Sequence, residues 1–520
     1  MSLLSLLKTP EHLSAQIAHG AQSTSKDHDN GGSADGQFQT GDFSVDEYRP
    51  IKVICIGAGF SGIVAGIRYM PSRVPNLDLK IYEKADGIGG TWYANRYPGL
   101  ACDIPSHCTQ WSSFYAPGPE ILAYMRRVAE KYKLSKYIRL QHELTHARWN
   151  ETSGKWELRI RRPRVPRNVD NRLDGIMKTI GTSPISNTPA NDIFEEFEDT
   201  ADILFLGTGA LSRWSWPDID GLKNFKGRLI HSAQWDVSDG TWEDSAKDWC
   251  DKIVGVVGLG SSAIQIVPAL QPKVKKIINL VRGKTWISSS FSESKLSELL
   301  SRESGTTNYI FTDADRERFK DPDYYKYFRH ELESDLNASI LGFQPHSARN
   351  SEMQKTVAAA LKATMLSKLA DKPEIAEYIV PSFDADFETT PIQRITETGI
   401  EFVDGRHTEL DVLVCATGFD TTFRLPFGVI GRHGRDLRKR WEPHASAYLS
   451  IAVDDFPNMF MATGPNSFVN SGSLLVIIER QVDYAVAATL KLQRERLKSI
   501  EVKLEAITDY EAYIKAYFTN

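Results

Sequence analysis

The sequence has few cysteines, no long apolar run and little excess of charge of either sign. Its 62 lysines and arginines face 67 acids, and the resulting formal charge of −5 disfavours a nucleic-acid-binding protein. No apolar run approaches the ~20 residues that a membrane-spanning helix needs. The start at Met1–Leu7 is too short and too weakly charged for a signal peptide. These features favour a soluble enzyme or small-molecule-binding protein without a membrane span.

The scattered cysteines exclude two further classes. They form no C-x-x-C pair, so neither a disulfide framework nor a zinc site is expected. Because free thiols suit a reducing compartment, we expect a cytoplasmic protein with no bound metal. The cysteines are Cys55, Cys102, Cys108, Cys250 and Cys415.

The strongest local pattern begins at Val53. An apolar run leads into G-x-G-x-x-G at Gly57, Gly59 and Gly62, which is how a parallel strand turns into a helix at a dinucleotide site. A second apolar strand ends at Glu83, roughly 20 residues after the last glycine, where an acid can accept hydrogen bonds from ribose hydroxyls. The two strands, the glycines and the acid together predict a dinucleotide site.

Turn-rich sequence follows Glu83. Adjacent glycines at Gly89 and Gly90, beside a dinucleotide site, favour contact with the cofactor over an ordinary loop. The segment Ala101–Ser106 then carries a single acid, Asp103. The local sequence leaves open whether Asp103 caps a turn or has a chemical role.

A second dinucleotide pattern opens after the strand at residues 253–257. Here Gly258 and Gly260 are followed by Ala263, which the motif tolerates because its last position needs only a small side chain. The next strand ends in Arg282 rather than an acid, and a cation suits the 2′-phosphate of NADP. A solvated strand end is the alternative interpretation of Arg282.

Two dinucleotide folds, one with an acid and one with an arginine, indicate two different nucleotides. FAD suits the first fold and NADPH the second, as in a flavin enzyme reduced by a nicotinamide. The predicted fold class is α/β, with two Rossmann-like dinucleotide-binding domains and a helical insertion. We expect a disordered arm over residues 1–45, an FAD domain over 46–235 and 391–520, and an NADP domain with the insertion over 236–390.

Other segments have weaker patterns. Apolar spacing predicts a surface helix over 119–133, and a turn at Gly154 indicates a hairpin over 149–161. Polar composition predicts an irregular insertion over 162–191, and helical composition predicts helices over 292–375. Buried strands ending in small residues are expected at 202–209 and 411–418. We expect the second of these to return the chain to the FAD sheet, and a final helix around 479–496 to pack against that sheet.

A family resemblance appears between the two glycine patterns. F-x-G-x-x-x-H-x-x-x-W runs from Phe225 through His231 to Trp235, and it is followed by Asp236, where many members of the family named next have proline. Over residues 51 to 520 the chain resembles the Baeyer–Villiger monooxygenases, the class B flavoprotein monooxygenases, and most of all fungal members that tailor polyketides and terpenoids. Further matching stretches are Gly90–Tyr93, Asn95–Gly99, Cys102–Ser106, Cys415–Asp420 and Gly464–Ser467.

The resemblance implies an activity in secondary-metabolite biosynthesis. NADPH would reduce FAD, O2 would add to flavin C4a, and the peroxyflavin would convert a ketone, such as a polyketide or terpenoid, to an ester or lactone. Asp103 would be the catalytic residue, close to both flavin and nicotinamide. His231 would couple the domains, with a buried histidine satisfied by the backbone as the alternative.

The implied FAD-side residues are Gly57, Gly59, Gly62, Glu83, Gly90, Thr91, Trp92, Tyr93, Ala94, Cys102, Asp103, Ile104 and Thr109. The remaining implied cofactor-binding residues are Gly258, Gly260, Ser261, Ser262, Ala263, Ile264, Arg282 and Gly283 on the NADP side, with Thr417 and Gly418.

Three departures from the family pattern keep alternatives open. The segment at residues 382–391 is short, acidic and lacks the arginine that family members place beside the flavin, and Arg394 is expected in a strand leading away from the site. A stretch after Cys108 is shortened, with Thr109 where tyrosine is common, and the chain stops at Asn520 before the family's usual tail. The alternatives are a flavoprotein with a non-oxygenating redox or isomerisation activity, and an impaired family remnant.

Overall fold

The computed structural model describes residues 43–44, 47–106, 111–164, 193–237, 240–281, 283–286, 291–303, 308–343, 352–380, 392–467 and 473–519. Two parallel sheets organise these residues, one for each predicted nucleotide fold. The predicted α/β class with two Rossmann-like units is therefore confirmed. Most of the predicted arm (1–45) and of the predicted insertion (162–191) lies outside the described residues.

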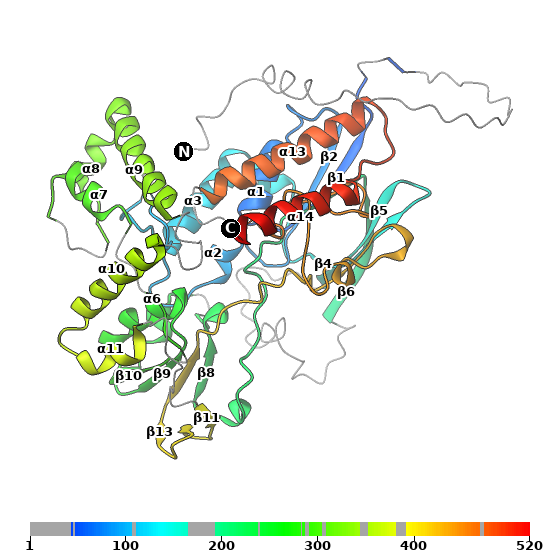
Figure 1. Cartoon of the computed structure of the whole chain (residues 1–520). Coiled ribbons are helices and arrows are strands. Elements are labelled where there is room, and N and C mark those ends of the chain that lie inside the picture. The colour runs from blue at the N-terminus through cyan, green and yellow to red at the C-terminus, as the bar shows by residue number, and fades with distance from the viewer. Residues whose placement is uncertain are drawn as a thin grey trace.

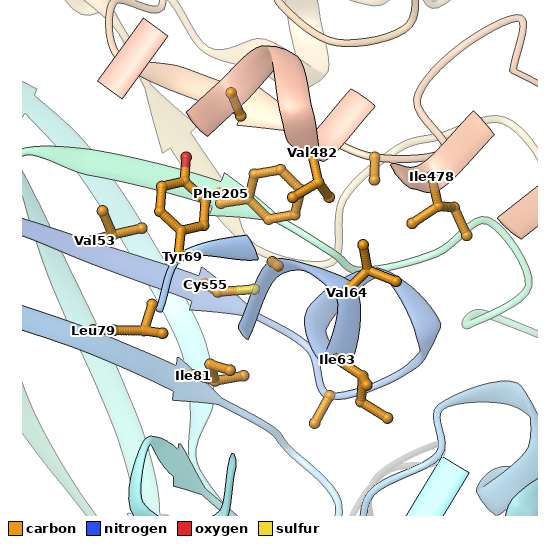
Figure 2. Close-up of a cluster of buried hydrophobic side chains, with 14 of the residues drawn as sticks. Val53, Cys55, Ile63, Val64, Tyr69, Leu79, Ile81, Phe205, Ile478 and Val482 are labelled. Atoms are coloured by element: carbon orange, nitrogen blue, oxygen red, sulfur yellow. The ribbon is translucent and has the colours of Figure 1, made fainter. Parts of the chain in front are cut away.

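The first sheet has five parallel strands in the order β16-β7-β1-β2-β3. Its central strand β1 alternates between two buried faces, as a strand covered on both sides does. Val53 and Cys55 pack under helices α1 and α13, whereas Ile54 and Ile56 face another sheet. Figure 2 shows the helix-covered face. The strands are β1 (Ile51–Ile56), β2 (Leu77–Tyr82), β3 (Ile138–Arg139), β7 (Ile203–Leu206) and β16 (Met459–Met461).

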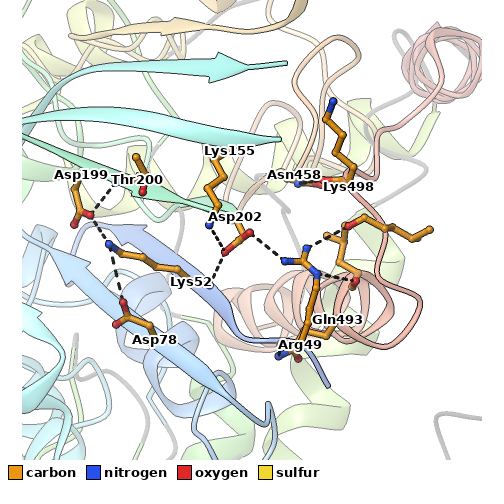
Figure 3. A network of polar contacts seen from close by, with 12 residues as sticks. Arg49, Lys52, Asp78, Lys155, Asp199, Thr200, Asp202, Asn458, Gln493 and Lys498 are labelled. Carbon is orange, nitrogen blue, oxygen red and sulfur yellow. Dashed lines mark hydrogen bonds and ion pairs between the residues drawn. The ribbon is translucent and has the colours of Figure 1, made fainter. Parts of the chain in front are cut away.

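A four-stranded sheet, β15-β4-β5-β6, covers the other face of the first sheet. Its β4–β5 pair is the predicted hairpin, which is confirmed. Charged contacts link this sheet to the first. The Asp199 carboxylate contacts Lys52, and Asp202 contacts Arg49 and the Lys52 amide (Figure 3). Asp199 also pairs with Lys80. The strands are β4 (Glu143–Asn150), β5 (Lys155–Pro163), β6 (Phe194–Ala201) and β15 (Gly428–Ile430).

The second parallel sheet has the order β10-β9-β14-β8. The expectation that residues 411–418 return to the first sheet is wrong, because β14 pairs with β9 and β8. The chain rejoins the first sheet only at β16. A small antiparallel sheet, β11-β12-β13, packs beside the second sheet. The strands are β8 (Arg228–His231), β9 (Ile253–Val257), β10 (Lys276–Leu280), β11 (Ile392–Ile395), β12 (Gly399–Phe402), β13 (His407–Glu409) and β14 (Val412–Cys415).

The described helices fall into three groups (Figure 1). With the first sheet lie α1 (Phe60–Arg68), α2 (Thr91–Ala94), the predicted surface helix α3 (Gly118–Lys131), α12 (Leu437–Arg440), α13 (Leu474–Arg494) and α14 (Leu504–Thr519). Helix α13 packs on that sheet as predicted, but α14 follows it, so it is not the final helix. With the second sheet lie α5 (Trp242–Ser245) and α6 (Ser261–Leu270).

The predicted helical insertion is confirmed as the third group. It comprises α7 (Glu293–Leu300), α8 (Asp313–Arg318), α9 (Pro322–Phe343), α10 (Glu352–Lys368) and α11 (Pro373–Ile379). Its aromatic cluster packs on Phe114 of the first fold, and the Phe114 amide donates to the carbonyl of Tyr309 at 2.8 Å. Within the described part of the chain, no helix has both the length and the apolar character to cross a membrane.

Candidate functional site

The first glycine turn connects β1 to α1 and requires glycine at positions 57 and 62. Gly57 has φ +102°, and a Cβ there would lie 2.5 Å from the carbonyl oxygen of Gly207, just after β7. A Cβ on Gly62 would lie 1.9 Å from the carbonyl oxygen of Gly57. The turn therefore presses against its neighbours and brings the first turn of α1 close to the strand ends, the place where a pyrophosphate binds in such folds.

Glu83 stands at the end of β2 beside this turn. Its carboxylate accepts hydrogen bonds from the Ala58 amide at 2.7 Å and the Ala85 amide at 2.8 Å, and the residue is only 7% exposed. Burial raises the pKa of Glu83, and the two backbone hydrogen bonds oppose that rise. Each carboxylate oxygen retains a lone pair for a ribose hydroxyl, so the geometry fits the predicted role.

The second glycine turn touches the first. A Cβ on Gly90, which has φ +54°, would lie 2.9 Å from the Cα of Gly59. Helix α2 starts directly after Gly90 and exposes Thr91 and Ala94, with Trp92 half-buried. The Tyr93 hydroxyl donates to Asp86 at 2.6 Å, so its polar end is already used within the loop.

The second nucleotide turn repeats the construction of the first. Gly258 has φ +125°, and its Cβ would lie 2.5 Å from the carbonyl oxygen of Ala416, just after β14. The Ala416 carbonyl thus packs against the glycine turn of the second sheet as the Gly207 carbonyl packs against that of the first. This close approach explains why both strands end in small residues. A Cβ on Gly260 would meet nothing within 4 Å, so the space above this turn is open to a ligand.

The start of α6 divides into a buried and an exposed side. Ala263 is 1% exposed and packs in the core of the second fold, as its small side chain allows. Ile264 is 45% exposed, and Ser261 is exposed beside Gly260. The free amide groups of this helix start suit a phosphate. Gly283 and Gly418 also have open space at their Cβ positions.

The segment that carries Asp103 lies where the two folds meet. Its Cys102 amide donates to the carbonyl of Ala116 at 2.9 Å, and Gln265 of α6 contacts its other side. Asp103 is exposed and Ile104 is 56% exposed. Burial raises the pKa of the Cys102 thiol, which keeps it protonated. The structure thus brings the predicted catalytic acid next to the second nucleotide helix.

His231 at the end of β8 is buried, with 1% exposure. Its Nδ1 accepts a hydrogen bond from the Ala233 amide at 3.1 Å, so Nε2 carries the proton and donates to the Thr417 hydroxyl at 3.2 Å. Trp214 stacks on the imidazole ring at 4.2 Å. Burial lowers the pKa of His231 to about 4 and keeps it neutral. His231 is therefore a buried histidine bonded to the backbone at Ala233, and it also joins the end of β8 to the segment after β14 through Thr417.

Several predicted features lie outside the described residues: Thr109, Arg282 and the segment 382–391. Arg394 is described, and it lies in β11 as expected. Its guanidinium pairs with Glu401 at 2.7 Å in the small antiparallel sheet. Arg394 is therefore not available as a cation for the site.

Sequence reasoning missed two groups of residues near the site. Gln265 contacts Asp103, and Tyr97 bonds Ser262 on the same helix. Trp214 stacks on His231. The only local signal was position, since Gln265 follows the second glycine pattern by one helical turn.

Comparisons with known proteins agree with two nucleotide-binding turns in this chain. A family model for NAD(P)-binding Rossmann-like domains matches residues 55–128. The FAD-binding monooxygenase tazF of Aspergillus terreus is 34% identical over 497 residues, which cover 90% of this chain and 80% of that protein. A Baeyer–Villiger monooxygenase of Pseudomonas aeruginosa is 30% identical over 497 residues, which cover 90% and 82%. A solved structure of oxidized steroid monooxygenase bound to NADP aligns with a TM-score of 0.69 at 26% identity, covering 90% of this chain and 91% of that one.

The two glycine turns, the acid after β2 and the open helix start of α6 fit FAD and NADPH. The tazF protein is named an FAD-binding monooxygenase, and the steroid monooxygenase structure is bound to NADP. The enzyme is accordingly an FAD-dependent monooxygenase that uses NADPH and O2. Its identity to relatives over most of their own length shows that this chain belongs to the Baeyer–Villiger monooxygenase family.

Proposed function

We propose that this enzyme carries out a Baeyer–Villiger reaction, converting a ketone to an ester or lactone in secondary-metabolite biosynthesis. The observation that carries the proposal is the contact between the Asp103 segment of the first fold and α6 of the second. This contact supports a single site shared by flavin and nicotinamide. The fungal FAD-binding monooxygenase and the bacterial Baeyer–Villiger enzyme among the relatives support the reaction class.

We assign FAD to the first sheet and NADP(H) to the second. Gly57, Gly59 and Gly62 would admit the pyrophosphate of FAD, and Glu83 would hold its ribose. Bound FAD, once reduced by NADPH, supplies the electrons that activate O2 for insertion beside the ketone carbonyl. Asp103 would orient the nicotinamide from its place beside α6.

The amide groups at the start of α6 would bind the NADP(H) phosphates, with Arg282 at the 2′-phosphate. The same assignment would place Ile104 along the flavin and Ile264 along NADP(H), and both side chains are half-exposed. We also propose a cytoplasmic location, supported by the free thiols of Cys55, Cys102, Cys250 and Cys415.

Isotope labelling tests the reaction. The purified enzyme would be supplied with NADPH, ¹⁸O2 and a panel of cyclic and polyketide-like ketones, and products would be analysed by mass spectrometry alongside hydrogen peroxide. We expect one ¹⁸O atom in the ester or lactone. Because segment 382–391 lacks a cation, we expect more peroxide than ester from simple ketones.

Two outcomes would overturn the proposal. Turnover to a product without ¹⁸O would establish the non-oxygenating alternative. NADPH oxidation that yields only peroxide across the whole panel would establish an impaired enzyme. Tight coupling with simple ketones would leave the reaction intact and show that another residue supplies the charge.

A further inference from the structure

Gln265 uses every polar atom of its side chain on one segment of the first fold. Its Oε1 accepts from the Ala101 amide at 3.2 Å, and its Nε2 donates to the Ala101 carbonyl at 3.2 Å and to Asp103 Oδ1 at 2.5 Å. Two acceptors face the nitrogen and one donor faces the oxygen, so chemistry fixes the orientation of the amide. Gln265 therefore holds both the backbone and the carboxylate of this segment.

The surrounding contacts make this attachment specific to α6. Gly99 has φ +74°, and a Cβ there would lie 2.6 Å from the carbonyl oxygen of Gln265. Tyr97 is buried and bonds the Ser262 hydroxyl. Every second residue from Tyr97 to Asp103 thus contacts the helix, and Gln265 makes the contact to the acid.

Helix α6 is also the helix that opens at Gly260, in the second nucleotide turn. Gln265 lies about one turn further along the same helix. Any displacement of the start of α6 would therefore reach Ala101 and Asp103 through the three hydrogen bonds of Gln265.

We propose that Gln265 is a positioning residue that ties occupancy of the second nucleotide turn to the placement of the Asp103 carboxylate. The inference rests on the proposed assignment of Asp103 to the flavin–nicotinamide side. It adds a mechanical link, through one amide side chain, between NADP(H) binding and the flavin site.

The test compares Gln265→Leu and Gln265→Glu with the natural protein in the full-length, FAD-loaded enzyme. Leu removes all three hydrogen bonds at similar size. Glu keeps the acceptor for the Ala101 amide but replaces the donor with a charge that Asp103 repels. Gln271→Leu is the matched control, because Gln271 is exposed at the other end of α6.

The first readout is structural and needs no turnover. Hydrogen–deuterium exchange of a peptide spanning residues 99–106 would be followed with and without NADP⁺. We expect NADP⁺ to slow this exchange at least tenfold in the natural protein and in Gln271→Leu, and to have little effect in both Gln265 variants. FAD content and NADP⁺ affinity should stay within about threefold.

The second readout separates binding from positioning. In anaerobic stopped-flow measurements, the limiting rate of flavin reduction by NADPH should fall about tenfold in Gln265→Leu and further in Gln265→Glu, the order expected when a hydrogen bond to a charged group is lost. The apparent Kd for NADPH should change little. A purely structural role would lower FAD content and leave the limiting rate of the loaded fraction unchanged.

The proposal falls if Gln265→Leu keeps the NADP⁺-dependent protection of residues 99–106 and the natural limiting rate. If Gln265→Leu fails to retain FAD, Gln265→Glu decides the matter by the same two measurements. Neither readout involves a ketone. The coupling can therefore be tested even if the enzyme proves unable to oxygenate ketones, and failure of one proposal does not imply failure of the other.

Discussion

Arg213 and Asp420 join the two connections that run from the first sheet to the second and back. The guanidinium of Arg213, after β7, contacts the carboxylate of Asp420, after β14, and the Asp420 amide donates to the Arg213 carbonyl at 2.8 Å. Trp214 of the first connection stacks on His231 at the end of β8, and His231 bonds Thr417 of the second connection. These contacts hold the two connections together.

A double-mutant cycle with Arg213→Met and Asp420→Asn tests this pairing. Both side chains are about a third exposed or less, so we expect a coupling energy of about 0.5–1 kcal/mol in urea unfolding. Asp420→Asn keeps the backbone bond and serves as the milder change. Strictly additive effects on the free energy of unfolding would mean that the ion pair does not couple the two connections.

Glu83 should control FAD retention. Glu83→Ala removes the acceptor of two backbone amides and of the ribose, so we expect FAD binding to weaken by about 1.5–3 kcal/mol, or roughly 10–100-fold. Glu83→Gln retains one acceptor oxygen, so its FAD affinity should lie between those of Glu83→Ala and the natural protein. Flavin fluorescence titration of the apoprotein measures this. Unchanged affinity in Glu83→Ala would contradict the assignment.

Two alanine substitutions in the glycine turns should behave oppositely. Gly62→Ala places a methyl group against the Gly57 carbonyl, so we expect loss of FAD and a lower thermal midpoint. Gly260→Ala meets no neighbour, so FAD content and stability should hold while the KM for NADPH rises. Equal FAD loss in both variants would show that the two turns do not bind different nucleotides.

Asp199 should make the stability of the protein depend on acid pH. Burial opposes its ionisation, but bonds from Lys52, Lys80 and Tyr82 outweigh that effect and lower its pKa to about 2. Because the folded-state pKa is depressed, this stabilisation of about 2 kcal/mol is present above pH ~4 and is lost as pH falls toward 2.

Asp199→Asn should therefore lower the unfolding free energy at neutral pH and flatten its fall between pH 4 and 2. Denaturant unfolding across that range measures both effects. Asp78→Asn is the control, because Asp78 is 59% exposed and lies 4.0 Å from Lys52. A parallel pH curve for Asp199→Asn and the natural protein would refute the role of the network.

The nucleotide turns were predictable because their signals are local. The glycines at 57, 62 and 258 are dictated by close backbone approach within a few residues of chain or to the next strand. The acid after β2 follows the same short-range logic. These patterns therefore predicted the two nucleotide folds, whereas the hairpin was predicted from the turn at Gly154 and the helical insertion from the composition of residues 292–375.

Strand pairing and the contacts between folds were not predictable in this way. Residues 412–415 are buried on both faces, and such a run predicts a parallel strand without saying which sheet it joins. Gln265 meets Ala101 across 164 positions, and Arg213 meets Asp420 across 207. Such partners are set by tertiary packing, for which a single sequence carries no signal.

The buried cysteines give the molecule a pair of internal reporters. Cys55 lies on the central strand of the first sheet and Cys415 on a central strand of the second, and burial raises the pKa of both thiols. Thiolates react and buried thiols do not, so each should resist alkylation until its own sheet opens, whereas Cys250 is exposed throughout. Mass-spectrometric labelling then reads the opening of the two nucleotide folds separately and without mutation. Saturation with FAD should slow the labelling of Cys55, and NADP⁺ that of Cys415.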